Sequence, residues 1–205
     1  MNKSIFVYLA IFLLLLAPLS VFSFGSGLAL VYSFFRLFGL YAFTLILIQV
    51  TFCSFREPLR DLLGPSAWYN YHHNAGKIAF ILVLSHPTTL LLYSYLSHDF
   101  SLYKSIVAFS YGSPLVSLGP VALYLLVIVL ITAFFFKARM WGDLPLWRRL
   151  HTLNYLIFIF AFAHSFTIGT DVAARLHSLW LFYGALFALG LLYRLNVFLS
   201  GKPSG

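Results

Sequence analysis

Six long apolar runs divide the 205-residue chain, and they constrain its fold more than any other feature. Each run is long enough to cross the roughly 30 Å hydrocarbon core of a bilayer as an α-helix. The predicted spans are residues 5–23, 28–53, 75–97, 114–136, 148–168 and 176–198. We therefore expect an all-α integral membrane protein, a six-helix transmembrane bundle that forms one domain over residues 1–205, with no internal repeat evident.

The first apolar run follows Lys3 and could instead be a secretory signal peptide. It is long for the apolar part of such a peptide, and it lacks a clean cleavage site of small residues. We expect a retained helix. Cleavage would leave five spans and would not change the orientation of the others.

Composition excludes a soluble globular domain, because 61% of the residues are hydrophobic and only 9% are charged. The net charge of +8 could suggest nucleic acid as a partner, but the basic residues occupy short loops rather than one patch. If the N-terminus is inside, the outer loops hold only Lys104 and Arg175, and Lys and Arg concentrate on the inner side, as in cytoplasmic loops. The inner segments hold Lys3, Arg56, Arg60, Lys137, Arg139, Arg148, Arg149, Arg194 and Lys202. We expect both termini in the cytoplasm and a multi-pass protein of the cell membrane.

Four histidines lie in the third and fifth predicted spans, which run in the same direction across the membrane. His72 and His86 are 14 residues apart in the third span, and His151 and His164 are 13 residues apart in the fifth. At 1.5 Å per residue, each pair is separated by roughly 20 Å along its helix. Two imidazoles at one depth are what a six-coordinate haem iron needs, and two such pairs would form an electron path across the bilayer.

Helix geometry leaves two questions open. Fourteen residues rotate a helix to within about 40° of the starting face, so His72 and His86 share one face. Thirteen residues leave about 140°, so either the fifth helix is distorted or each haem is approached from a different side. His73 competes with His72 as the inner ligand, and we prefer His72 because it shares a face with His86.

Other interpretations of these side chains are weaker. A zinc cage needs four ligands close together, whereas these histidines are far apart along each helix, and Cys53 is the single cysteine. A proton relay lacks an Asp or Glu in the spans to share the proton. A transporter that passes metal ions or protons without haem remains the alternative from a different functional class.

The motifs resemble the ferric reductase-like transmembrane domain shared by ferric reductases and NADPH oxidases. "HHNAGKIAFILVLSH" is similar to the family's first ligand helix, with Gly76 four residues after His72 as the family's small residue. "WRRLHTLNYLIFIFAFAH" is similar to its second ligand helix, and "RLFGLYAF", with Arg36 and Gly39, resembles the opening of its second helix.

The resemblance implies two haem b groups, the inner one held by His72 and His151 and the outer one by His86 and His164. Arg36 would then pair with the outer propionates, because a lone guanidinium in lipid is costly and Arg binds carboxylates in a bidentate fashion. Snorkelling of Arg36 to the interface is the alternative. Two further basic residues could hold the inner propionates or anchor the helix to lipid headgroups: Arg148 and Arg149.

The expected function is transfer of electrons from a cytoplasmic-side donor to an extracytoplasmic acceptor, as the electron-transfer component of an oxidoreductase. The chain shows no Gly-rich dinucleotide motif, so we expect no flavin or NAD(P)H domain of its own. The donor would be a separate flavin/NAD(P)H reductase, a flavin bound on the cytoplasmic side, or quinol. The second candidate function is that of the haem-binding membrane subunit of the periplasmic methionine sulfoxide reductase system, a group of proteins that resembles this chain in length. Membrane lipid is an expected partner and nucleic acid is not.

Overall fold

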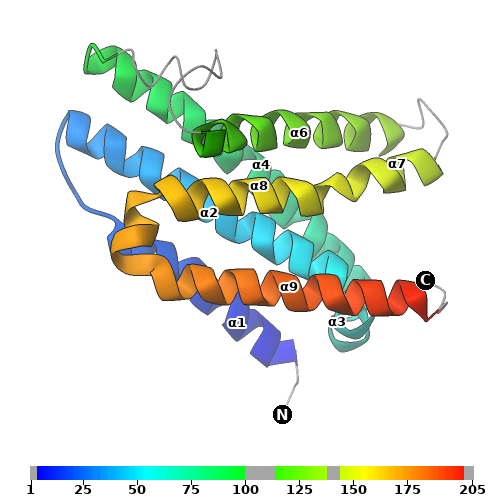
Figure 1. Cartoon of the computed structure of the whole chain (residues 1–205). Helices are drawn as coiled ribbons and strands as arrows, with labels where there is room; N and C mark the ends of the chain where they lie inside the picture. The colour runs from blue at the N-terminus through cyan, green and yellow to red at the C-terminus, as the bar shows by residue number, and fades with distance from the viewer. Residues whose placement is uncertain (1–3, 100–113, 138–143, 201–205) are drawn as a thin grey trace. The chain divides into compact units, whose positions relative to one another are not determined.

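The computed structural model describes residues 4–99, 114–137 and 144–200, and every element within these ranges is helical (Figure 1). Lys3, Lys104, Arg139 and Lys202, on which part of the predicted orientation depends, lie outside the described residues. In chain order the elements are α1 (Ser4–Leu16), the 3₁₀-helix η1 (Ala17–Val21), α2 (Leu28–Ser54), α3 (Arg56–Leu63), α4 (Pro65–Leu96), α6 (Pro114–Lys137), α7 (Leu144–His151), α8 (Leu153–Ile168), the π-helix η2 (Val172–Leu176) and α9 (His177–Leu199).

Within residues 4–99, 114–137 and 144–200, six helical segments are long and apolar enough to cross a membrane, which agrees with the predicted number. They are Ser4–Val21, Leu28–Ser54, Pro65–Leu96, Pro114–Ala133, Leu146–Ile168 and Val172–Leu199. Large apolar side chains on these segments point outward, among them Ile81, Leu189 and Leu192, which are 62%, 59% and 63% exposed. Such a surface is stable in hydrocarbon and not in water. The chain is therefore a multi-pass membrane protein.

The third span differs from the predicted residues 75–97. It begins at Pro65 rather than at residue 75, and it is preceded by α3, a segment that the sequence analysis assigned to a loop. Gly64, with a φ of 85°, turns the chain between α3 and α4, and Pro65 occupies the first helical turn, where a missing N–H costs nothing.

The fifth span is interrupted between α7 and α8 at Thr152. The Thr152 amide lies 3.2 Å from both the Arg148 and the Arg149 carbonyl oxygens, and the Tyr155 amide donates to the Thr152 carbonyl at 3.1 Å. This i to i−3 pattern is that of a 3₁₀ turn, in which each residue rotates by about 120° instead of about 100°. The tighter turn reduces the 140° offset expected between His151 and His164. The fifth helix is thus distorted, one of the two possibilities left open above.

The helices form two compact units. The first unit comprises residues 1–99 and 175–205 and therefore includes α1, α2, α3, α4 and α9. The second unit comprises residues 100–174, with α6, α7 and α8.

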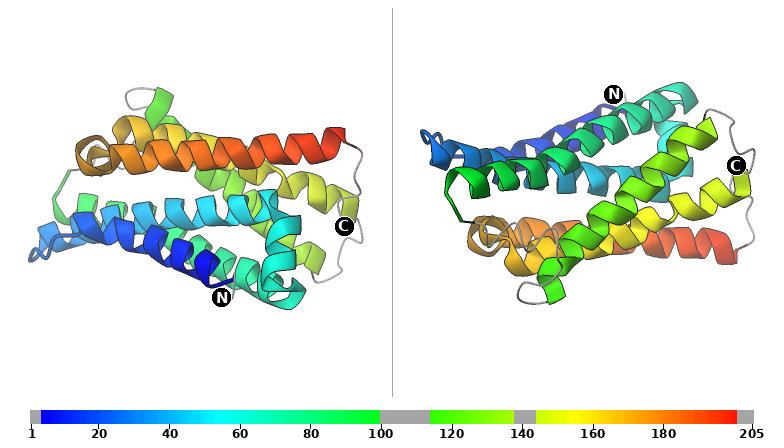
Figure 2. Two further views of the ribbon diagram at one scale, coloured as in Figure 1. Left: turned by 90° about the horizontal axis from the view of Figure 1, so that it is seen from below. Right: turned by 90° about the horizontal axis from the view of Figure 1, so that it is seen from above.

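In the first unit, α2 is the central helix and packs against α1, α4 and α9 (Figure 2). In the second half of α2, apolar residues on nearly every face of the helix are buried, and Leu47 has no exposed surface. An aromatic cluster joins α2 to α9, because Phe43 stacks on Trp180 with ring centroids 5.0 Å apart, and Tyr183 lies 5.2 Å from Trp180. Aromatic pairs of this kind stabilise a fold beyond the area that they bury.

An ion pair joins α3 to α9 at one end of the first unit. Arg194 donates to Glu57 with an Nη1 to Oε1 distance of 3.0 Å. Burial alone would raise the pKa of Glu57, but its backbone hydrogen bond and the hydrogen bond and charge of Arg194 lower that pKa below its ordinary value. Glu57 is therefore ionised at neutral pH, and the pair fixes α3 relative to α9.

In the second unit, α6 and α8 run antiparallel and pack along their length (Figure 1). Both helices are largely apolar, and Val129 of α6 and Ile157 and Phe158 of α8 are almost completely buried. Antiparallel packing brings the first turns of α6 beside the last turns of α8, where His164 lies.

Replacement of Gly190 by Val should disrupt the packing of α9 on α2. A Cβ atom at Gly190 would lie 2.9 Å from the Cβ of Ser54, so the helices would have to separate. We expect a loss of about 1–3 kcal/mol of stability, as for other overpacked cores. The measurement is the midpoint of thermal unfolding in detergent, followed by circular dichroism. Leu189→Val, at a neighbouring exposed position, is the matched control, and equal midpoints for the two variants would contradict this packing.

Candidate functional site

His86 lies on α4 and contacts α2 at close range. Its Nδ1 atom is 3.0 Å from the carbonyl oxygen of Phe35, and its ring stacks on the Phe35 ring with centroids 4.5 Å apart. A Cβ atom at Gly39 would lie 2.6 Å from that same Nδ1, so only glycine leaves room for the imidazole here. When Nδ1–H donates to the carbonyl, Nε2 carries the lone pair that can bind a metal.

His164 repeats this arrangement in the second unit. Its Nδ1 atom is 3.3 Å from the carbonyl oxygen of Leu115 on α6. A Cβ atom at Gly119 would lie 2.6 Å from the Cε1 of His164. Again the imidazole rests on a glycine and donates to the carbonyl four residues before it, so that Nε2 carries the lone pair that can bind a metal.

The other two candidate histidines, His72 and His151, each contact a tryptophan of their own helix. Trp68 stacks on His72 with ring centroids 5.5 Å apart and planes inclined by 5°. Trp147 lies against His151 at 5.2 Å and 30°. In each helix the tryptophan precedes the histidine by four residues, one helical turn, so that the two rings lie one above the other.

The two units therefore carry the same local design, although no internal repeat was predicted from the sequence. The equivalent residues are separated by nearly constant intervals along the chain. They are Phe35 and Leu115 (115 − 35 = 80), Gly39 and Gly119 (119 − 39 = 80), Trp68 and Trp147 (147 − 68 = 79), His72 and His151 (151 − 72 = 79), and His86 and His164 (164 − 86 = 78).

The antiparallel contact between α2 and α4 continues from His86 to the α3 end of the first unit. Three contacts, about one helical turn apart, lie along this helix pair. A Cβ at Gly76 would lie 4.0 Å from Cδ of Gln49, and Cys53 Sγ lies 3.9 Å from His72 Nδ1. Nearest to α3, Arg56 Cζ lies 5.7 Å from the Trp68 ring centroid. His72 and His86 both contact α2, so both lie on the same side of α4, as their spacing predicted.

His73 lies next to His72 and stacks on Tyr69, with ring centroids 5.9 Å apart. This is the same one-turn contact that Trp68 makes with His72. His72 also contacts α2, through the Cys53 sulfur. We therefore keep His72 as the inner candidate and His73 as its alternative.

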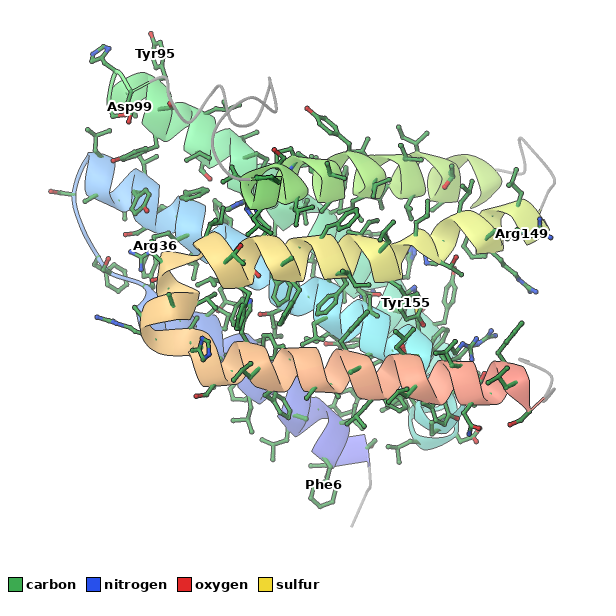
Figure 3. The ribbon with its side chains drawn as sticks, viewed as in Figure 1. Phe6, Arg36, Tyr95, Asp99, Arg149 and Tyr155 are labelled. Carbon is green, nitrogen blue, oxygen red and sulfur yellow. The ribbon has the colours of Figure 1, made fainter. Side chains whose placement is uncertain are left out.

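The basic candidates occupy less enclosed positions. Arg36 is half-buried on α2, with its guanidinium 5.8 Å from the Tyr32 ring centroid (Figure 3). Arg148 and Arg149 are exposed on α7, and Arg149 projects from the ribbon (Figure 3). Exposure suits either contact with lipid headgroups or a place at the rim of a cofactor site.

Several buried polar atoms have no hydrogen-bond partner among the residues that the structure describes. They include both amide atoms of Gln49, Thr51 Oγ1, Arg56 Nε, Trp68 Nε1 and Trp147 Nε1. An unsatisfied buried polar group costs about 1–3 kcal/mol. Within the same described ranges, no three His, Cys, Asp or Glu side chains gather to hold a bare metal ion.

Sequence reasoning named the histidines but missed what holds them. The acceptors are backbone carbonyls of Phe35 and Leu115, and every residue carries a carbonyl. Gly119 was not singled out, and Gly39 only through the family motif. Comparing residues 35–86 with residues 115–164 would have revealed the paired glycines.

Gly39→Ala and Gly119→Ala should each displace the imidazole that rests on the glycine. Alanine normally stabilises a helix relative to glycine by about 1 kcal/mol. Here a Cβ atom 2.6 Å from the ring should instead cost about 1–3 kcal/mol. Thermal unfolding in detergent is the measurement. Gly76→Ala is the control, because its nearest neighbour would lie at 4.0 Å, and stabilisation of all three variants would contradict the arrangement.

Comparison with known proteins gives one positive result. The family model described as ferric reductase like transmembrane component matches residues 38–162, more than half of the chain. The match includes His72, His86 and His151, begins after Arg36 and ends before His164. No curated protein and no solved structure matches the chain. The chain belongs to the ferric reductase-like transmembrane family.

Proposed function

We propose that this chain is a di-haem b membrane cytochrome that carries electrons from a cytoplasmic-side donor to an extracytoplasmic acceptor. Family membership suggests transmembrane electron transfer, and domains of this family typically bind haem. The observation that carries the proposal is the repeated design of His86 and His164. Each is an imidazole on a membrane helix whose Nδ1 is directed to a backbone carbonyl across a glycine.

The donor set fits haem b. An imidazole that ligates iron must be neutral, and its second nitrogen is usually held by an acceptor that fixes the tautomer and the ring orientation. His86 and His164 meet this requirement with carbonyl oxygens at 3.0 and 3.3 Å. At the inner level, His72 has the Cys53 sulfur at 3.9 Å from Nδ1, a weaker acceptor.

The proposed ligand pairs follow from the matched depths of the histidines. The inner haem would take His72 and His151, and the outer haem His86 and His164. Bound haem iron supplies one-electron redox chemistry between its ferrous and ferric states. The chain would contribute the axial ligands, fix the tautomers of His86 and His164, and surround the ligands with apolar helices that exclude water.

Orientation follows from the basic residues. We propose that the α3 end of the first unit and the α7 end of the second face the cytoplasm, with both termini on that side. The basic residues there are Arg56, Arg60, Arg148, Arg149 and Arg194. Such a rim suits an acidic flavin/NAD(P)H reductase, since complementary charge speeds encounter. A bound flavin or quinol is the other source of electrons.

Each of the four ligand variants should lose one haem. His72→Ala and His151→Ala should remove the inner haem or make it high-spin, and His86→Ala and His164→Ala the outer one, because the iron loses an axial nitrogen. The measurements are the haem-to-protein ratio and the Soret band before and after reduction. His177→Ala, at an exposed position on α9, is the control and should keep both haems.

Two results would change this proposal. A purified wild-type protein without a Soret band would favour the transporter. A His72→Ala protein with two low-spin haems, beside a His73→Ala protein that loses one, would make His73 the inner ligand.

Replacement of Arg36 by Ala should lower the midpoint potential of the outer haem. A cation near the iron stabilises the reduced form, so its loss should shift the potential by about 60 mV, a tenfold change in the one-electron equilibrium constant. Redox titration followed by absorbance is the measurement, and Arg36→Lys, which keeps the charge, should restore most of the shift. Identical potentials in wild type and Arg36→Ala would indicate that Arg36 only reaches the membrane interface.

A further inference from the structure

Two indole N–H groups lie beside the inner histidines with the same geometry. Trp68 stacks on His72 and Trp147 on His151, each from one turn earlier in its helix. Both Nε1 atoms are buried, and neither has a hydrogen-bond partner among the residues that the structure describes. A buried tryptophan normally finds an acceptor for its N–H. The same unsatisfied donor at equivalent positions of both units points, in each unit, to an acceptor of the same chemical kind.

A positive charge accompanies this donor in the first unit. The Arg56 guanidinium lies 5.7 Å from the Trp68 ring centroid, and its Nε is also buried and without a partner in the described part of the chain. Arg56, Trp68 and His72 thus form successive layers at the α3 end. Arginine in a partly buried position favours carboxylate or phosphate oxygens. The acceptor should therefore be an oxyanion.

The buried groups on the other side of His72, away from α3, differ from Arg56 and Trp68. One turn further along α4, Gly76 faces the amide of Gln49, which is buried and has neither of its polar atoms paired within the described residues. An amide is neutral and carries both a donor and an acceptor. Among these buried groups, the cationic and donor-only ones therefore lie on the α3 side of His72, whereas Lys77, on the other side, is exposed.

We propose that Trp68 donates a hydrogen bond to a propionate carboxylate of the inner haem, with Arg56 neutralising its charge, and that Trp147 has the equivalent role beside His151. This inference rests on the proposed function. Haem b carries both carboxylates on one edge, and the donors occupy the turn next to the inner ligands in both α4 and α7. The inner haem would therefore be oriented with its propionates toward the proposed cytoplasmic side. Trp68 and Trp147 are positioning residues, because they fix the cofactor without binding iron.

The test uses Trp68→Phe and Trp147→Phe in the haem-loaded protein. Phenylalanine keeps an aromatic ring against each histidine and removes the N–H donor together with part of the indole's ring area. We expect each variant to release the inner haem to apomyoglobin about tenfold faster, the effect of losing one hydrogen bond to a charged acceptor. The midpoint potential of the inner haem should also fall, since the carboxylate charge is less well neutralised. The outer haem should not change. Tyr69→Phe, one residue along α4, is the matched control.

The remaining outcomes separate the alternatives. The haem content of the wild type is measured first. A wild-type protein without haem would overturn the proposed function itself. If both haems are present and the tryptophan variants behave like the wild type, only the present inference fails. If Gln49→Leu instead lowers the midpoint potential of the inner haem, the propionates lie on the Gln49 side of His72 and not on the α3 side. The experiment is run in a phosphate-free maltoside detergent. An effect seen only after phospholipid is added would identify a lipid phosphate as the acceptor and overturn the proposal.

Discussion

An imidazole can hold iron on a membrane helix only if the protein controls its other nitrogen. Without an acceptor, the ring can rotate or exchange tautomers, and in hydrocarbon its N–H would be unsatisfied. The chain meets this constraint for His86 and His164 with a carbonyl that already belongs to a helix. A carbonyl has two lone pairs, so it can accept from the imidazole and keep its helical hydrogen bond. The imidazole can approach because a glycine follows four residues later, and this requirement places α2 against α4 and α6 against α8.

His72 is held differently from His86 and His164, and under the proposed function this difference would have a redox consequence. A strong acceptor at Nδ1 makes an imidazole a better electron donor to iron and favours the ferric state. The outer histidines have carbonyl acceptors, whereas His72 has the thiol of Cys53. By this effect alone, the outer haem would have the lower potential. The cationic groups near the Trp68 end would add to the difference by stabilising a reduced inner haem.

Hydropathy and spacing were sufficient to predict part of this structure. Six apolar runs specify six spans, because the bilayer requires about 20 apolar residues for each. The 14-residue interval placed His72 and His86 on one face of a helix, and both contact α2. The helix break at Thr152 could not be predicted, because it depends on local bonds such as that from Thr152 Oγ1 to the Arg149 carbonyl. The α3 helix was not predicted, because its eight residues include four charged ones and such a composition is typical of a loop between spans. The acceptors of His86 and His164 were missed because a backbone carbonyl has no signature in the sequence.

Electron paramagnetic resonance of the oxidised, purified protein, combined with a count of haem per chain, tests the central claim most directly. Paired histidine ligation at two depths predicts two haems per chain, both ferric low-spin, with no high-spin signal. Reduction should convert both to the ferrous state without loss of haem. A protein with no haem, or with one high-spin haem per chain, would contradict the account.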